Sequence, residues 1–180
     1  MIKRTAILLI GAVLIVSVLA SGCTFNVGNT TTSSTTTTYT SSKGYSITYP
    51  SDWSKPDEQN NGAAVVFLTP TNNKTENLNV QVYNLTASDT LSNITSSIRS
   101  EVENFSDFKL IDAGNTTLAG NPAYKIVYTA TTSNGNNLKV TQIWTVKDGK
   151  EYIITYKGAP TNYETHLSAA QKMIDSFQIK

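Results

Sequence analysis

Residues 124–156 read YKIVYTATTSNGNNLKVTQIWTVKDGKEYIITY and contain three runs rich in β-branched and aromatic residues. Runs of this composition are typical of β-strands. Asn134-Gly135 separates the first two runs, and Asp148-Gly149 separates the last two. Both dipeptides tolerate the positive φ angles that tight hairpin turns require. The stretch therefore predicts two consecutive hairpins, that is, an antiparallel meander.

Further strands are expected upstream of this meander. Apolar and polar residues alternate over residues 45–49 and 78–83, which is the period of a strand with one buried face. Residues 64–68 form a short apolar run of the kind found inside sheets. The folded domain is therefore expected to begin at Gly44 and to end at Lys180.

Two segments instead have the spacing of amphipathic helices. The apolar stripe of the first is Leu91, Ile94, Ile98, Val102 and Phe105, and that of the second is Leu167, Ala170, Ile174 and Phe177. Ser88 or Asp89 is the expected N-cap of the first helix, and Thr161 and Glu164 have the spacing of a capping box for the second. An antiparallel sheet with one mid-chain helix and one C-terminal helix belongs to the α+β class.

Four segments in this order resemble the PsbP/Mog1-like domain family, particularly its lipid-anchored or secreted members in methanogenic archaea. They are YSITYPSDW (45–53), TLAGNPAYKIVYT (117–129), VKDGKEYIITY (146–156) and MIDSFQI (173–179). The resemblance implies an α/β/α sandwich with a central antiparallel sheet over residues 44–180. The family includes a photosystem accessory protein, a Ran-binding protein and bacterial lipoproteins, so the resemblance implies no shared reaction.

The first 23 residues have the organisation of a lipoprotein signal peptide. Lys3 and Arg4 precede an apolar run, and small residues lead to Cys23, the only cysteine of the chain. A cysteine at this place is the expected site of lipid attachment through its sulfur. Ala20 stands where the usual lipobox prefers leucine, and the alternative is an uncleaved membrane anchor. Both interpretations place the rest of the chain outside the cytoplasm.

Residues 24–43 are rich in Thr and Ser and are predicted to be a disordered, flexible linker, because they offer almost nothing to bury. An extracytoplasmic location permits N-glycosylation at sequons but does not by itself indicate it. The candidate sites are Asn29, Asn73, Asn84, Asn93, Asn104 and Asn115, each followed two places on by Ser or Thr.

Few residues offer chemistry. His166 is the single histidine, and we expect it near the surface at the edge of the last helix rather than in a catalytic site. Glu101, Glu103 and Asp107 are close in sequence but do not form a calcium loop, and one histidine with one distant cysteine gives no transition-metal site. The segment 114–120 lacks the Gly-Lys-Ser/Thr of a phosphate loop. We therefore predict no catalytic residue, no metal and no cofactor.

The remaining features narrow the class of partner. Charged residues make up 15% of the 180-residue chain and its net charge is +1, without the basic concentration of a nucleic-acid binder. Six aromatic residues are expected mainly in the core, with a carbohydrate or peptide groove as the alternative: Trp53, Tyr124, Tyr128, Trp144, Tyr152 and Tyr156.

The sequence thus favours a membrane-tethered, extracytoplasmic accessory or binding domain that is not an enzyme. Its expected contacts are the membrane, through lipid or an N-terminal helix, and a protein or cell-envelope partner. Two alternatives remain open. One is a cell-envelope enzyme whose carboxylates converge only in the fold, and the other is a lipoprotein that binds a small ligand or metal.

Overall fold

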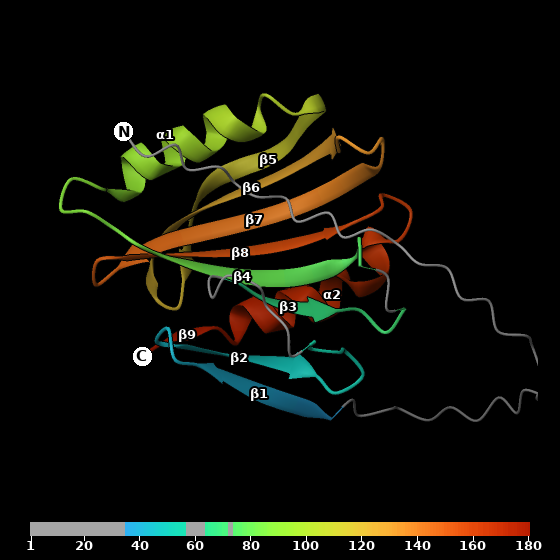
Figure 1. Cartoon of the computed structure of the whole chain (residues 1–180), viewed down its shortest axis with the longest axis horizontal. Helices are drawn as coiled ribbons and strands as arrows, with labels where there is room; N and C mark the ends of the chain where they lie inside the picture. The colour runs from blue at the N-terminus through green and yellow to red at the C-terminus, as the bar shows by residue number, and fades with distance from the viewer. Residues whose placement is uncertain (1–34, 57–63, 72–73) are drawn as a thin grey trace, which may run out of the picture.

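The computed structural model describes residues 35–56, 64–71 and 74–180 (Figure 1). A six-stranded antiparallel sheet has the strand order β3-β4-β8-β7-β6-β5, and a smaller sheet has the order β1-β2-β9. The strands are β1 (Thr36–Ser41), β2 (Tyr45–Pro50), β3 (Ala64–Leu68), β4 (Asn77–Asn84), β5 (Ser106–Leu118), β6 (Asn121–Thr131), β7 (Asn137–Lys147), β8 (Lys150–Gly158) and β9 (Gln178–Ile179). The helices are α1 (Leu91–Val102) and α2 (Tyr163–Asp175).

The predicted meander forms the centre of the large sheet. β6 pairs with β7, and β7 pairs with β8, both antiparallel. The turn between β7 and β8 consists of Asp148 and Gly149, whose φ angles are 50° and 70°. In the longer turn between β6 and β7, Gly135 has a φ of 78° and donates its backbone N–H to the Thr132 carbonyl over 2.8 Å. Both hairpins are confirmed.

Strand β5 was not anticipated from the sequence. It has 13 residues and forms an edge of the large sheet, so its side chains are mostly exposed and polar. Its register with β6 shifts twice, between Ser106 and Lys109 and between Leu110 and Asp112. These irregularities break the two-residue alternation by which a strand is recognised.

The expected linker over residues 24–43 is corrected at its carboxyl end. Residues 36–41 form β1, which pairs with β2 along its whole length, including a 3.0 Å contact between the Thr38 and Thr48 hydroxyls. Threonine is β-branched and therefore suits an exposed strand once a partner supplies hydrogen bonds. The folded domain thus begins before Gly44, with the half-buried Tyr39 packed against its core.

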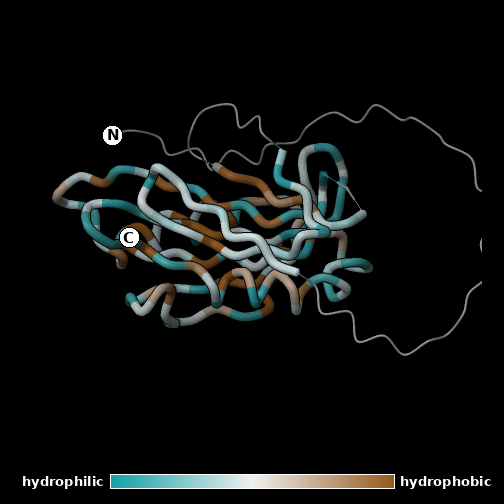
Figure 2. Tube along the Cα trace, turned by 90° about the horizontal axis from the view of Figure 1, so that it is seen from below, coloured by the Kyte–Doolittle hydropathy of each residue, from teal (hydrophilic) through white to brown (hydrophobic). Residues whose placement is uncertain are grey.

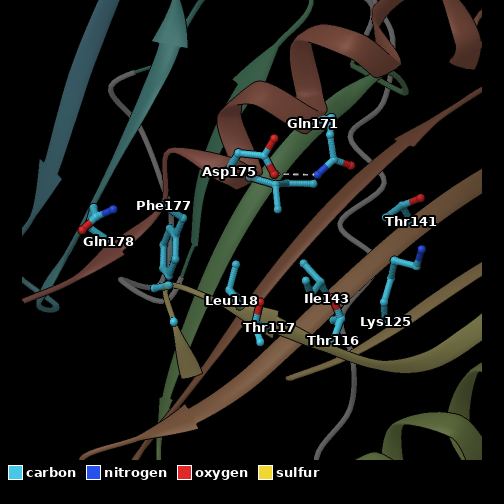
Figure 3. Close-up of a pocket in the computed structure, with 13 residues that line it drawn as sticks. Thr116, Thr117, Leu118, Lys125, Thr141, Ile143, Gln171, Asp175, Phe177 and Gln178 are labelled. Carbon is cyan, nitrogen blue, oxygen red and sulfur yellow. Dashed lines mark hydrogen bonds between the residues drawn. The ribbon is translucent and has the colours of Figure 1, made fainter. Parts of the chain in front are cut away.

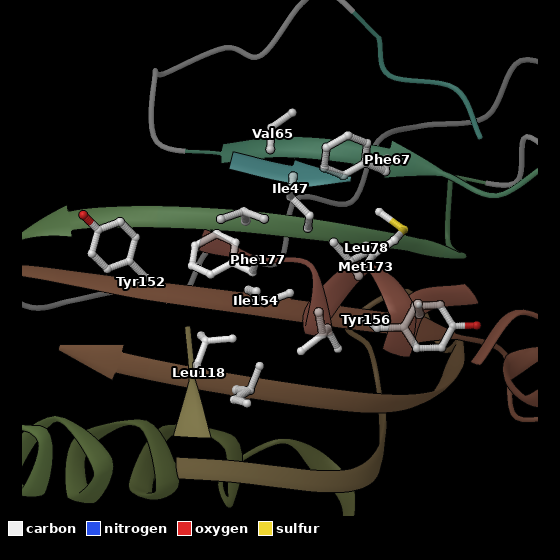
Figure 4. Packing of buried hydrophobic residues seen from close by; sticks show 14 of the residues in the cluster. Ile47, Val65, Phe67, Leu78, Leu118, Tyr152, Ile154, Tyr156, Met173 and Phe177 are labelled. Atoms are coloured by element: carbon white, nitrogen blue, oxygen red, sulfur yellow. The ribbon is translucent and has the colours of Figure 1, made fainter. Parts of the chain in front are cut away.

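The two helices cover opposite faces of the large sheet (Figure 1). Helix α1 packs Ile94 and Val102 against the cluster around Trp144, and α2 packs Met173 and Ile174 against the cluster around Ile154. The three-stranded sheet lies on the same side as α2, and its buried residues join the α2 cluster (Figures 1 and 4). The α+β, sandwich-like architecture is therefore confirmed.

The predicted helix caps are wrong in detail. The N-cap of α1 is Thr90, which accepts from the Asn93 backbone N–H, while the Asn93 side chain accepts from Thr90 in return. Asp89 instead accepts from Thr86 in the preceding turn. The N-cap of α2 is Asn162, and its side chain makes no capping hydrogen bond. Each helix starts one residue away from the position that the composition favoured.

The aromatic residues lie mainly in the core, as expected. Five of the six are buried, and Tyr124 is half-buried beside Trp144: the five are Trp53, Tyr128, Trp144, Tyr152 and Tyr156. Hydrophobic residues occupy the inner layers, whereas the outer strand β1 is pale in the hydropathy colouring (Figure 2). Within the part of the chain that the structure describes, no helix is both long and apolar enough to cross a membrane.

Candidate functional site

A groove of about 470 Å³ opens between α2 and the β5–β6 hairpin. Residues of α2, of the β5–β6 hairpin and of β7 line it together. The turn residues Ala119 and Gly120, with φ angles of 49° and 73°, are among its lining residues. Figure 3 shows side chains from α2 and from the sheet lining the same space.

The lining is mainly polar and includes one lysine and one aspartate. Leu118, Ile143 and Phe177 are almost fully buried and form part of the floor. The polar side chains are Thr116, Thr117, Lys125, Thr141, Gln171, Asp175 and Gln178. Gln171 donates to the Asp175 carboxylate over 2.8 Å, one helical turn away (Figure 3). Such a surface can bind a ligand that has several hydrogen-bonding groups.

Thr141, which lines the groove, belongs to a pair of hydroxyl groups with Tyr163 of α2. The Thr141 and Tyr163 hydroxyl oxygens are 2.5 Å apart, and both residues are buried. Burial raises the pKa of the Tyr163 hydroxyl, so this group remains protonated near neutral pH. Lys125 lies next to this pair on β6 and binds Asp112 over 2.9 Å. The Lys125 ammonium lowers the pKa of the exposed Asp112 carboxyl.

His166 lies outside the groove and differs from the expectation. Its Nδ1 is 2.9 Å from Oε1 of Glu76, a carboxylate that is only 1% exposed. The His166 side chain is 17% exposed, and its ring lies edge-on to Trp53. The expected surface histidine is therefore corrected: it is a half-buried residue that joins α2 to the loop before β4.

The predicted modification sites fall in different places. Cys23, Asn29 and Asn73 lie outside the described residues. The other four sequon asparagines are exposed: Asn84 at the end of β4, Asn93 on α1, Asn104 after α1 and Asn115 on β5. Asn93 also uses its side chain to cap α1. Their glycosylation remains a prediction.

The acidic residues near the end of α1 do not gather. Glu103 pairs with Arg99 over 3.0 Å, and Asp107 accepts from the Thr131 hydroxyl. Within residues 35–56, 64–71 and 74–180, no three His, Cys, Asp or Glu side chains are grouped as a metal site requires.

The groove residues could not be selected from the sequence. Lys125 and Thr141 occupy alternating strand positions that read simply as solvent-facing. Gln171 and Asp175 read as the polar face of α2. Only the packing of α2 beside the β5–β6 hairpin brings these four side chains together, and β5 itself had not been predicted. Glu76 likewise gave no signal, because it stands in a polar stretch before β4.

No curated protein sequence matches the chain. Solved structures of similar fold include cyanobacterial PsbP (CyanoP) from Synechocystis sp. PCC 6803, with a TM-score of 0.61 and 20% identity over 86% of this chain and 98% of that one. LpqN of Mycobacterium tuberculosis, which is involved in cell envelope biogenesis, has a TM-score of 0.57 and 17% identity. That match covers 83% of this chain and 87% of LpqN. A protein from Bacteroides thetaiotaomicron has a TM-score of 0.57 and 14% identity, and the match covers 79% of this chain and 48% of that one.

At these identities the likeness establishes the fold and leaves the activity open. The sequence comparison is more specific, because the profile of PsbP-like proteins matches residues 7–179, nearly the whole chain. This match confirms the PsbP-like part of the family resemblance that the four sequence segments indicated. The chain belongs to the family of PsbP-like proteins.

Proposed function

We propose that this chain is a membrane-tethered, extracytoplasmic accessory or binding domain without catalytic activity, and that the groove beside α2 is its binding site. The observation that supports this proposal is the groove's lining, in which Thr, Gln, Lys and Asp side chains from α2 and from the sheet gather around one hollow. Polar side chains that converge on one hollow can orient a ligand by hydrogen bonds.

The arrangement of ionisable groups favours binding over hydrolysis. A carboxylate-based hydrolase places two carboxyl groups across its site. Of the described groove-lining residues, Asp175 alone carries a carboxylate, and Gln171 donates to it. His166, the single histidine, does not line the groove and is directed to Glu76.

The amino-terminal sequence supports the proposed location. Residues 1–23 have the pattern of a lipoprotein signal peptide that ends at Cys23. LpqN, which shares the fold, is involved in cell envelope biogenesis, and an envelope location for this chain agrees with that pattern. Lipid on Cys23 would tether the domain through the residues between Cys23 and β1.

The binding role is tested by capture from the membrane fraction of cells that express the full chain. Gln171→Trp places a large side chain in the groove at an exposed position of α2. Ser100→Trp is the matched control, because Ser100 is exposed on α1 at the opposite face of the sheet. We expect a partner that is recovered with the wild type and with Ser100→Trp but lost with Gln171→Trp. Equal recovery with all three proteins contradicts the groove as the binding site.

The tether is tested by Cys23→Ser followed by cell fractionation and mass spectrometry. We expect the variant to lose lipid and to leave the membrane or to remain unprocessed, because only the thiol can carry a thioether lipid. A variant that is processed like the wild type and stays on the membrane without lipid overturns the lipoprotein assignment.

A further inference from the structure

The hydroxyl pair retains hydrogen-bonding capacity. Thr141 and Tyr163 share one hydrogen bond of 2.5 Å. Because each hydroxyl carries one hydrogen and the shared bond uses one of the two, the other hydrogen can be donated to an acceptor outside the pair. When Tyr163 is the donor of the shared bond, the free hydrogen is that of Thr141, which lines the groove, so a ligand can reach it.

Two lysines flank the hydroxyl pair. Thr141 stands opposite Val127, and Lys125 is two residues from Val127 on β6, while Lys139 is two residues from Thr141 on β7. Residues two apart on a strand point to the same face, so both ammonium groups lie on the groove side of the sheet. The Lys139 Nζ is 4.7 Å from the centre of the Tyr163 ring. Both lysines also act electrostatically on the Tyr163 hydroxyl.

The carboxylates that now pair with these lysines are exchangeable. Lys125 binds Asp112, whose side chain is 56% exposed, and Lys139 binds Glu164, which is 62% exposed, over 2.6 Å. Exposed ion pairs contribute little free energy, since water solvates both charges nearly as well. An anionic group of a ligand can therefore replace either side-chain carboxylate without leaving a buried charge unpaired.

We propose that Lys125, Lys139, Thr141 and Tyr163, together called the lysine corner, bind an anionic oxygen group of the ligand, either a carboxylate or a phosphate. The inference rests on the proposed function, because it specifies the ligand chemistry of the same groove. The two ammonium groups supply charge, and the spare hydroxyl hydrogen supplies a directed donor between them. The Thr and Gln side chains elsewhere in the lining then supply hydrogen bonds to the rest of the ligand.

The test is isothermal titration of the full chain in detergent with two probes, inorganic phosphate and succinate. We expect saturable binding of at least one probe, and the tighter probe distinguishes phosphate from carboxylate chemistry. Lys125→Gln and Lys139→Gln should each weaken binding by about tenfold, the value of a charge-assisted hydrogen bond. Thr141→Val should also weaken it. Lys147→Gln is the control, since Lys147 forms a similar exposed ion pair at the other end of β7.

The decisive variants remove the competing carboxylates. Asp112→Asn and Glu164→Gln should tighten anion binding by about twofold to fivefold, because each frees a lysine from its present partner. Both positions are exposed, so the fold tolerates these changes. The lysine corner is overturned if neither probe shows saturable binding. It is also overturned if neither variant binds the anion more tightly than the wild type. If Gln171→Trp still abolishes partner capture in that case, the proposed binding function stands and only the ligand chemistry is wrong.

Discussion

Glu76 is the residue whose burial most needs compensation. Its side chain is 1% exposed, and Oε2 has no hydrogen-bond partner among the described residues. Oε1 contacts Nδ1 of His166, and a side chain added at Gly158 would come within 3.2 Å of Cγ. A buried carboxyl group is costly unless it is paired, so His166 is expected to stabilise the fold rather than act on a substrate.

The contact between Glu76 and His166 can be tested by mutation. His166→Ala should lower the free energy of unfolding by about 2 to 3 kcal/mol, because it leaves the buried Glu76 side chain without its partner. The same change in a Glu76→Gln background should lower the free energy of unfolding by less, because a buried neutral amide without a partner is less unfavourable than a buried carboxylate without one. Chemical denaturation of the four proteins in a double-mutant cycle measures the difference. Equal costs in the two backgrounds contradict a direct interaction.

The buried tyrosines predict a limit at alkaline pH. Burial raises the pKa of Tyr45, Tyr128, Tyr156 and Tyr163 above the ordinary tyrosine value of 10.0. Because the folded pKa exceeds the unfolded one, the folded state retains these protons more strongly, and the stability they contribute is complete below pH 10 and lost above it. Unfolding and tyrosinate absorbance should therefore rise together above pH 10. Tyrosinate formation in a still-folded chain would contradict this burial.

At the scale of elements, β1 carries a prediction about the domain boundary. A fragment that starts at Gly44 should be less stable than one that starts at Thr35 by about 2 to 4 kcal/mol, because it loses the β1–β2 ladder and the contacts of Tyr39 with Tyr45 and Phe67. Thermal unfolding of both fragments measures the effect. Tyr39→Phe in the longer fragment is the control and should change little. Equal melting temperatures would show that β1 is dispensable.

Strands whose apolar and polar residues alternate regularly could be predicted from the sequence. Strands that form only because a neighbouring strand supplies hydrogen bonds could not. The turns at Asn134-Gly135 and Asp148-Gly149 encode their own geometry, so both hairpins followed from local sequence. Strands β1 and β5 carry exposed polar side chains and acquire their conformation from hydrogen bonds to β2 and β6. The groove depends on the β5–β6 hairpin, and for that reason its lining could not be assembled from sequence patterns.

At the scale of the whole molecule, the large sheet connects two hydrophobic clusters. Adjacent residues of one strand pack on opposite faces of this sheet. On β7, Ile143 joins the cluster under α2 and Trp144 joins the cluster under α1. On β8, Ile154 joins the cluster under α2 and Ile153 joins the cluster under α1. The Trp144 indole also donates to Thr95 on α1 over 3.0 Å. A shared sheet means that neither cluster can unpack without disturbing strands that the other requires.

This coupling predicts one cooperative transition, and the two tryptophans can test it. Trp53 lies in the α2 cluster and Trp144 in the α1 cluster, and the chain has no other tryptophan. In Trp53→Phe the fluorescence reports on the α1 side, and in Trp144→Phe it reports on the α2 side. Within each variant, fluorescence and far-ultraviolet circular dichroism should give the same denaturant midpoint, because both clusters unfold with the sheet. A fluorescence midpoint that precedes the loss of secondary structure in only one variant would show that one cluster unfolds separately.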